Sequence, residues 1–116
     1  MNSTVYYRHE ISCAHKLKMD YESRCKNLHG HNYLIEVWIT DKINENGMVA
    51  DFSDIKKVLD TYDHKYLNDY IQQPTVENLA AHLLIELKQK LNLSGEVRVR
   101  IWEDSDSYVE VLMSCD

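Results

Sequence analysis

The chain has 116 residues, of which 44% are hydrophobic, and a formal net charge of −6. A chain of this length forms one domain, residues 1–116, with enough apolar residues for a core. The negative charge argues against a general nucleic-acid binder, and no run of roughly 20 apolar residues is present to span a membrane. The N-terminus has no apolar segment typical of a targeting peptide, and three cysteines do not suggest a disulfide framework. We therefore expect a cytoplasmic protein.

Two strands are predicted in the first third of the chain. Residues 4–15 alternate between apolar and polar side chains, and residues 31–41 repeat the pattern. The apolar positions are Val5, Tyr7, Ile11 and Cys13 in the first strand, and Tyr33, Ile35, Val37 and Ile39 in the second. Alternation of this kind is typical of strands with one buried face.

Two helices and two further strands follow. Asp51 is the expected N-cap of a helix over residues 52–62, and Thr75 is the expected N-cap of a helix that ends near Leu91. Residues 96–103 and 108–113 again alternate. The order β-β-α-α-β-β predicts an α+β fold, in which both helices cover one face of a four-stranded antiparallel sheet.

The second face of the predicted sheet is charged. Its side chains are Arg8, Glu10, Glu36, Arg98 and Arg100. One interpretation is a solvated face. The other is that the sheet edges join neighbouring subunits, so that this face lines the polar interior of a barrel and no strand edge stays exposed.

Three histidines are candidates for a metal site. His29 and His31 are two positions apart in the segment CKNLHGH (25–31), so they share one face if a strand begins there. His31 and His15 both have the parity of the buried residues. Three neutral imidazoles, with water or substrate in the fourth position, are a common zinc site. Scattered structural histidines are the alternative, and the matching parity of His15 favours zinc.

Cys25 has two possible roles beside such a metal. It could be a fourth ligand in a closed structural site, or a thiolate that acts as a general base. Its position in the loop before the strand, between Arg24 and Lys26, favours the base. Cys13 is most simply a small core residue.

Two further groups could take part in chemistry. Asp63 and His64 are adjacent beyond the first predicted helix, an arrangement that suits proton transfer but also occurs on ordinary surfaces. Glu103 has the buried parity of Val99 and Ile101, where a carboxylate must be paired or must bind something. A buried glutamate suits the N–H edge of a pterin or guanine ring.

Taken together, these segments resemble the 6-pyruvoyltetrahydropterin synthase family, and within it the 6-carboxytetrahydropterin synthase branch of queuosine biosynthesis. The likeness covers nearly the whole chain. It includes AHKL (14–17), CKNLHGH (25–31), GMVADFSDIK (47–56), DHKYLN (63–68), PTVENLA (74–80) and the glutamate of IWEDS. The three residues between Cys25 and His29 match the carboxy-forming branch, since the pyruvoyl-forming branch typically has a longer gap.

The resemblance implies a tunnelling fold that assembles into barrels, as a homohexamer built from two trimers. It also implies a role for each candidate residue. His15, His29 and His31 match the zinc ligands, Cys25 matches the catalytic base, Asp63 and His64 match the second proton-transfer unit, and Glu103 matches the pterin anchor, with Thr75 a weaker pterin contact. Two departures from the family pattern stand out. Ser12 and Cys13 occupy positions where small or aromatic residues are usual, and Cys13 could compete for the metal, while Asp104 stands where a hydroxyl residue is common.

The expected activity is that of a zinc lyase. It would convert 7,8-dihydroneopterin triphosphate to 6-carboxy-5,6,7,8-tetrahydropterin, acetaldehyde and triphosphate. One alternative is formation of 6-pyruvoyltetrahydropterin at the same site. Another is a non-catalytic module that binds zinc or pterin, with Cys25 as a closing ligand.

Overall fold

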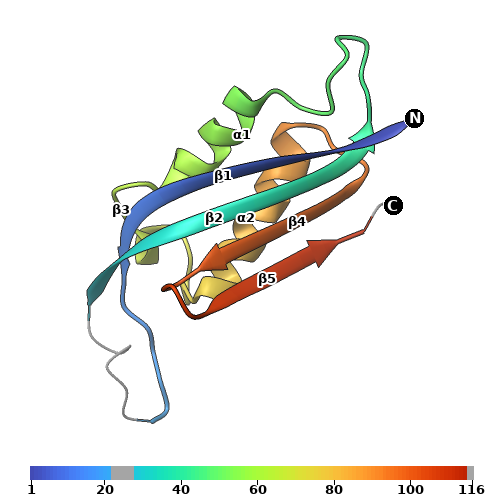
Figure 1. The fold of residues 1–116 in the computed structure, drawn as a ribbon. Helices are drawn as coiled ribbons and strands as arrows, with labels where there is room; N and C mark the ends of the chain where they lie inside the picture. The colour runs from blue at the N-terminus through green and yellow to red at the C-terminus, as the bar shows by residue number, and fades with distance from the viewer. Residues whose placement is uncertain (22–27, 115–116) are drawn as a thin grey trace.

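The computed structural model describes residues 1–21 and 28–114 (Figure 1). The four long strands are β1 (Asn2–His15), β2 (His29–Lys42), β4 (Glu96–Trp102) and β5 (Tyr108–Met113). The helices are α1 (Phe52–Leu59) and α2 (Val76–Lys90). Between them lie the 3₁₀ turns η2 (Asp60–Tyr62) and η3 (Leu67–Asp69) and the two-residue strand β3 (Lys65–Tyr66). The predicted order of long elements is confirmed.

The strands form one sheet in the order β3-β1-β2-β4-β5. The four long strands are antiparallel neighbours, as predicted. β1 and β2 pair along their whole length, from Asn2 opposite Lys42 to His15 opposite His29. β3 was not predicted; it pairs in parallel with β1 through Cys13 and Ala14. The chain therefore returns to the end of β1 that carries His15.

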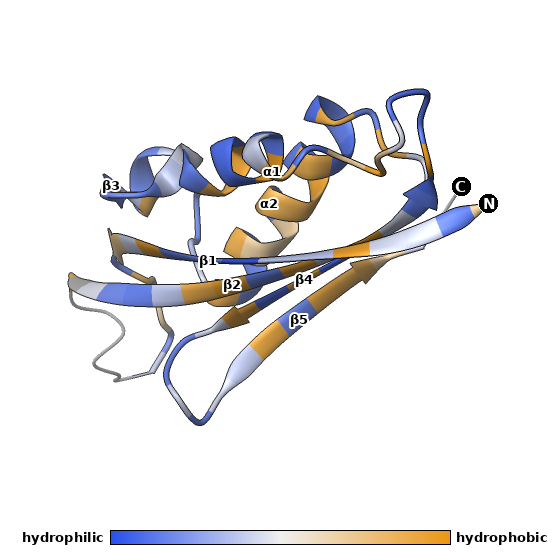
Figure 2. Cartoon of the chain, turned by 45° about the horizontal axis from the view of Figure 1, so that its top comes forward, coloured by the Kyte–Doolittle hydropathy of each residue, from blue (hydrophilic) through white to orange (hydrophobic). Residues whose placement is uncertain are grey.

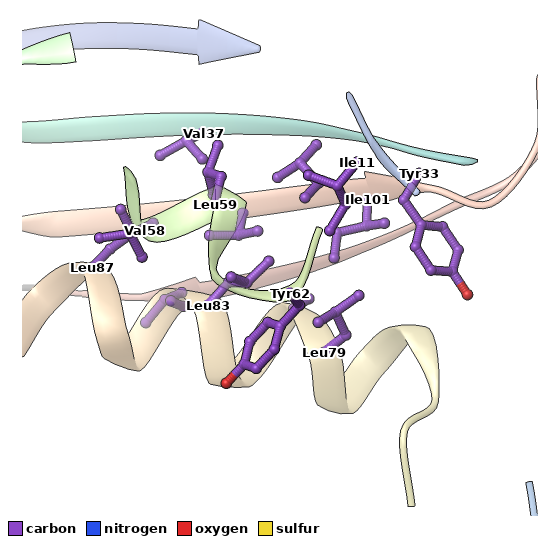
Figure 3. Packing of buried hydrophobic residues seen from close by; sticks show 14 of the residues in the cluster. Ile11, Tyr33, Val37, Val58, Leu59, Tyr62, Leu79, Leu83, Leu87 and Ile101 are labelled. Atoms are coloured by element: carbon purple, nitrogen blue, oxygen red, sulfur yellow. The ribbon is translucent and has the colours of Figure 1, made fainter. Parts of the chain in front are cut away.

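Both helices cover one face of the sheet and leave the other open (Figure 2). Most of the alternating strand positions predicted to be buried are buried, including Ile11, Ile35, Val99 and Ile101, whereas Val5 and Tyr7 are only partly buried. They pack against the apolar side of α2, which contributes Leu79, Leu83 and Leu87, and against Val58 and Leu59 of α1 (Figure 3). Burial of this one stripe of each helix explains why both lie on the same side.

The two predicted helix caps are present. Asp51 Oδ1 accepts a hydrogen bond from the backbone N–H of Ser53 at 2.8 Å, and Thr75 Oγ1 accepts from the N–H of Asn78 at 3.1 Å. The first helix was predicted to reach Tyr62, but its α-helical part ends at Leu59 and residues 60–62 tighten into η2. This tightening directs the chain toward β1.

A second anchor lies at the other end of the sheet. Asp41 Oδ2 accepts hydrogen bonds from the N–H groups of Ser94, at 3.0 Å, and Gly95, at 3.1 Å. A Cβ atom added at Gly95 would lie 2.0 Å from the carbonyl oxygen of Thr40. Only glycine fits this close approach, which fixes the connection between α2 and β4.

The open face of the sheet carries the predicted charged residues, and Glu36, Arg98 and Arg100 form ion pairs across strands. Arg100 Nη2 lies 2.8 Å from Glu110 Oε1, and its guanidinium group lies 4.2 Å from the ring centre of Tyr108 and 4.9 Å from that of Trp38. Trp102 Nε1 donates to Glu36 Oε1 at 2.6 Å. This face therefore carries a network of contacts between aromatic and charged side chains.

Both ends of the described chain lie at the same end of the sheet, opposite to His15 (Figure 1). Met113 of β5 pairs with Val97 of β4, which pairs with Ile39 near the end of β2. Across residues 1–21 and 28–114, neither helix has the length and apolar character needed to cross a bilayer.

Candidate functional site

Two of the three predicted metal ligands meet where β1 ends. The rings of His15 and His31 have centroids 5.3 Å apart and stand at 71° to each other. His15 is almost fully buried, with 2% of its surface exposed. His29 lies directly opposite His15 in the strand pairing. The side chain of His29 and the whole of Cys25 lie outside the described residues.

The hydrogen bond of His15 fixes its chemical form. Its Nδ1 lies 2.7 Å from the carbonyl oxygen of Pro74. A carbonyl oxygen can only accept, so Nδ1 carries the proton and the neutral ring has its lone pair on Nε2. A histidine that donates through one nitrogen to a backbone carbonyl is the usual form of a metal ligand. This donor chemistry therefore fits zinc.

The described part of the chain does not by itself contain a complete metal site. Among its histidine, cysteine and acidic side chains, no group of three or more is placed to hold a metal ion. Burial, with a smaller contribution from Asp63, raises the pKa of the Cys13 thiol to about 12 in the metal-free chain. Cys13 is part of the hydrophobic core, as expected.

Asp63 and His64 are attached to β1 by two backbone contacts. Oδ1 of Asp63 accepts a hydrogen bond from the N–H of Ser12 at 2.9 Å, and the N–H of His64 donates to the carbonyl oxygen of Ser12. The Ser12 hydrogen bond lowers the pKa of Asp63, and the neighbouring His64 adds to this effect. Nδ1 of His64 lies 3.1 Å from Asp63 Oδ1, and its side chain is 81% exposed. The pair thus joins an ionised carboxylate to an accessible imidazole.

One groove is shared by His64 and His31. It has a volume of about 480 Å³, and its lining also includes Ser12 and Tyr66. The short strand β3 is what brings His64 to this place, since Lys65 lies opposite Cys13 in the parallel pairing. Three sequence segments, residues 12–14, 30–32 and 64–66, therefore face one cavity, large enough for a small ligand.

Glu103 differs from its prediction. It was expected to be buried at the end of a strand, but β4 ends at Trp102 and the Glu103 side chain is 40% exposed. Its N–H donates to the carbonyl oxygen of Ser107 at 3.1 Å and closes the turn before β5. Its carboxylate lies 3.8 Å from Nε2 of His31, so it stays next to the histidines. The expectation of burial is wrong for the single chain, and the role of Glu103 as a ring anchor stays a prediction.

The neighbouring Asp104 has a structural role. Its Oδ1 accepts hydrogen bonds from the N–H of Asp106 and the hydroxyl of Ser107, both at 2.8 Å. These bonds, the first from Asp106, lower the pKa of Asp104. The departure from a hydroxyl residue at this position therefore serves the turn between β4 and β5.

Thr75 lies between the site and the second helix. Its hydroxyl oxygen caps α2, and the preceding residue, Pro74, supplies the carbonyl that binds His15. The Thr75 hydroxyl can still donate a proton to a ligand while it accepts from Asn78. Contact with a pterin stays a prediction.

Sequence reasoning missed two residues near the site. Asn68 and Gln73 each bind the backbone just after His15, Asn68 at Lys16 and Gln73 at Lys18. The position of Asn68 in the DHKYLN segment was the only sequence feature that pointed to it. No sequence feature pointed to Gln73.

The β-β-α-α-β-β order, the helix-covered antiparallel sheet and the histidines at its end define a small α+β protein of the tunnelling-fold class. The sequence profile of the 6-pyruvoyl tetrahydropterin synthase family matches residues 4–113. The chain belongs to this family.

The names of individual relatives state different activities. A 6-carboxy-5,6,7,8-tetrahydropterin synthase of Synechocystis is 35% identical over 97 residues, which cover 73% of this chain and 74% of the relative. A dihydroneopterin monophosphate aldolase of Pyrococcus furiosus is 34% identical over 118 residues, which cover 96% of this chain and 98% of the relative. The solved structure of 6-pyruvoyl tetrahydropterin synthase of Caenorhabditis elegans superposes with a TM-score of 0.74 at 27% identity, covering 98% of this chain and 97% of that one.

Proposed function

We propose that this protein is a zinc-dependent 6-carboxytetrahydropterin synthase of queuosine biosynthesis. It would convert 7,8-dihydroneopterin triphosphate to 6-carboxy-5,6,7,8-tetrahydropterin, with release of acetaldehyde and triphosphate. The observation that carries the proposal is the geometry of His15, which donates to the Pro74 carbonyl and lies next to His31. Family membership and the name of the Synechocystis relative support it.

His15, His29 and His31 would hold the zinc ion. Bound there, zinc supplies Lewis-acid activation of the substrate's side-chain hydroxyls and of the adjacent C–H bond. The buried position of His15 and the hydrogen bond from its Nδ1 to Pro74 orient this imidazole before any metal arrives.

The remaining roles belong to protein side chains. Cys25 would remove the carbon-bound proton as a general base. Asp63, which Ser12 keeps ionised, would orient His64, and His64 would return protons at the groove. Glu103 would hold the N–H edge of the pterin ring, with Thr75 as a second contact. The exposure of Glu103 in the single chain suits a carboxylate that becomes covered by ligand or by a neighbouring subunit.

A second candidate function is the aldolase reaction on dihydroneopterin monophosphate. The specific observation in its favour is the match to the Pyrococcus furiosus aldolase over nearly the full length of both chains. Retro-aldol cleavage of the side chain would leave a one-carbon hydroxymethyl group on the ring and release a two-carbon aldehyde phosphate. Formation of 6-pyruvoyltetrahydropterin and a non-catalytic zinc or pterin module remain the other candidates.

One experiment separates these functions. The zinc-loaded protein is incubated in parallel with dihydroneopterin triphosphate and with dihydroneopterin monophosphate, and the products are identified by mass. Acetaldehyde with a carboxylated tetrahydropterin supports the proposal. A pyruvoyl product, or a hydroxymethyl pterin with an aldehyde phosphate, would replace it with the corresponding alternative. No turnover with either substrate would favour the binding module.

We also infer that the active form is a homo-oligomer, a homohexamer by family resemblance. The open face carries Arg100, Glu36 and Glu110 in cross-strand pairs, which suits the wall of a polar lumen. β5 forms one edge of the sheet. At the other edge, β3 pairs with only a short part of β1, so the rest of β1 is also an edge. Joining these edges between copies would pair their free backbone groups.

A further inference from the structure

Two side-chain amides hold the backbone that follows His15. Oδ1 of Asn68 accepts from the N–H of Lys16 at 2.8 Å, and its Nδ2 donates to the carbonyl oxygen of Lys16 at 2.7 Å. Gln73 repeats this at Lys18, where Oε1 accepts from N–H at 3.1 Å and Nε2 donates to the carbonyl oxygen at 2.7 Å. Each amide thus copies the donor and acceptor of a strand residue, after the sheet itself has ended.

Asn68 extends an attachment that begins earlier in β1. Asp63 binds Ser12, β3 pairs with Cys13 and Ala14, and Asn68 then binds Lys16. The segment from Asp63 to Asn68 therefore follows β1 past His15 on one side. The backbone of His15 is fixed between two consecutive attachments.

Gln73 is linked to the ring of His15 through the next residue in the chain. It precedes Pro74, whose carbonyl oxygen accepts from His15 Nδ1 at 2.7 Å. The carbonyl oxygen of Gln73 itself accepts from Nδ2 of Asn78 and from the N–H of Thr75. The Pro74 carbonyl is thereby held from both sides, by the pairing with Lys18 and by the start of α2.

We propose that Asn68 and Gln73 are positioning residues that fix His15 in a single orientation, with the proton on Nδ1. A buried imidazole that must bind through Nε2 needs a carbonyl at Nδ1 and a backbone that does not shift. Asn68 holds the backbone next to His15, and Gln73 holds the segment whose next residue, Pro74, supplies the carbonyl. The consequence for metal binding rests on the proposed function, whereas the orientation and tautomer of His15 do not.

The test uses the full chain with Asn68→Ala and Gln73→Ala. The variants Asn68→Asp and Gln73→Glu keep side-chain volume but set an oxygen against the carbonyl of Lys16 or Lys18. They provide a readout even where the alanine variants fail to fold. Gln72→Ala is the matched control, because Gln72 is the exposed neighbour of Gln73.

Two measurements are made on each protein. Long-range ¹H–¹⁵N NMR of the metal-free protein reports which ring nitrogen of His15 carries the proton, with the signal assigned from a His15→Gln variant. Chelator competition reports the zinc dissociation constant. The wild type and the control should show one Nδ1-protonated form. The four Asn68 and Gln73 variants should show a mixture and bind zinc about 10-fold more weakly, the usual cost of losing an outer-shell contact.

The outcomes separate the two claims. Folded variants with an unchanged His15 tautomer and unchanged zinc affinity would overturn the positioning role and leave the amides as stabilising contacts only. A wild type that binds no zinc, but whose His15 tautomer depends on Asn68 and Gln73, would overturn the proposed function and leave the positioning role intact.

Discussion

Asp63 and Ser12 are joined by a hydrogen bond in which the backbone N–H of Ser12 donates to Oδ1 of Asp63 over 2.9 Å. The bond connects the residue after η2 to Ser12, near the C-terminal end of β1, across about 50 residues of sequence. It sets where β3 begins, and so where His64 meets the groove shared with His31. One contact thus serves both the fold and the candidate site.

The first prediction concerns the pH dependence of this contact. The pKa of Asp63 lies below its ordinary value of 3.8, mainly through the Ser12 hydrogen bond. Because the folded-state pKa is the lower one, the ionised carboxyl stabilises the protein above its ordinary pKa, and this is lost as pH falls through the folded-state value. Asp63→Asn should cost on the order of 1 kcal/mol at pH 6, and the gap to wild type should narrow below about pH 4. Urea unfolding across this pH range measures it, and a gap that does not change with pH would contradict the assignment.

The second prediction concerns His29. If it is the third ligand, His29→Ala should lower bound zinc well below one per subunit and abolish turnover. Metal analysis after dialysis measures the first effect. His82→Ala, on α2 away from the sheet end, is the control and should keep its zinc. Full zinc and full activity in His29→Ala would remove His29 from the site.

The third prediction separates the two roles of Cys25. As a general base, Cys25→Ala should keep zinc and fold but lose roughly 10²–10⁴-fold in rate. Cys115→Ala serves as the control for loss of a thiol elsewhere in the chain. Loss of zinc from Cys25→Ala would instead identify Cys25 as a ligand and favour the binding module.

The fourth prediction concerns Gly95. Gly95→Ala would place a Cβ atom 2.0 Å from the Thr40 carbonyl oxygen, so the α2–β4 connection must shift, at a cost of roughly 1–3 kcal/mol. Gly30→Ala is a matched comparison, since its Cβ would meet only the Cys13 carbonyl oxygen at an ordinary 3.7 Å. Thermal unfolding should show a much larger loss for Gly95→Ala, and equal losses would be inconsistent with the close approach.

The fifth prediction concerns assembly. Dilution that dissociates the proposed oligomer should abolish activity even while zinc stays bound, because the family resemblance implies active sites at subunit boundaries. Sedimentation at the assay concentration provides the measurement. A fully active monomer of 13.7 kDa would disprove both the barrel and any site shared between subunits.

The long elements could be predicted because their patterns repeat many times. The alternation of apolar and polar residues around Ile11, Ile35 and Val99 predicted the strands and their buried face, and with it the face on which His15 lies. β3 could not be predicted, since a pattern cannot be recognised in two residues and its pairing depends on distant Ser12. The 3₁₀ turn after Leu59 was also not predicted. The helical spacing of apolar residues continues to its last residue, so the sequence pattern does not mark where the α-helix ends.

The site was predictable only in part. Parity placed His15 and His31 together, and their rings do lie side by side. Parity failed for Glu103 because β4 stops one residue earlier, and the Asp104 turn then governs the chain. The roles of Asn68 and Gln73 could not be predicted, because a side-chain amide that binds distant backbone produces no periodic pattern in the sequence.

The position of the chain ends has a practical consequence. Met113 and the N-terminal part of β1 lie at one end of the sheet, and His15 lies at the other, about 40 Å from Asn2 along the strand. A fluorophore, a surface linker or a fusion partner attached at either terminus would therefore leave the groove accessible. The molecule can be immobilised near the end of the sheet that carries Met113 and still expose the groove lined by His31 and His64 to a ligand in solution.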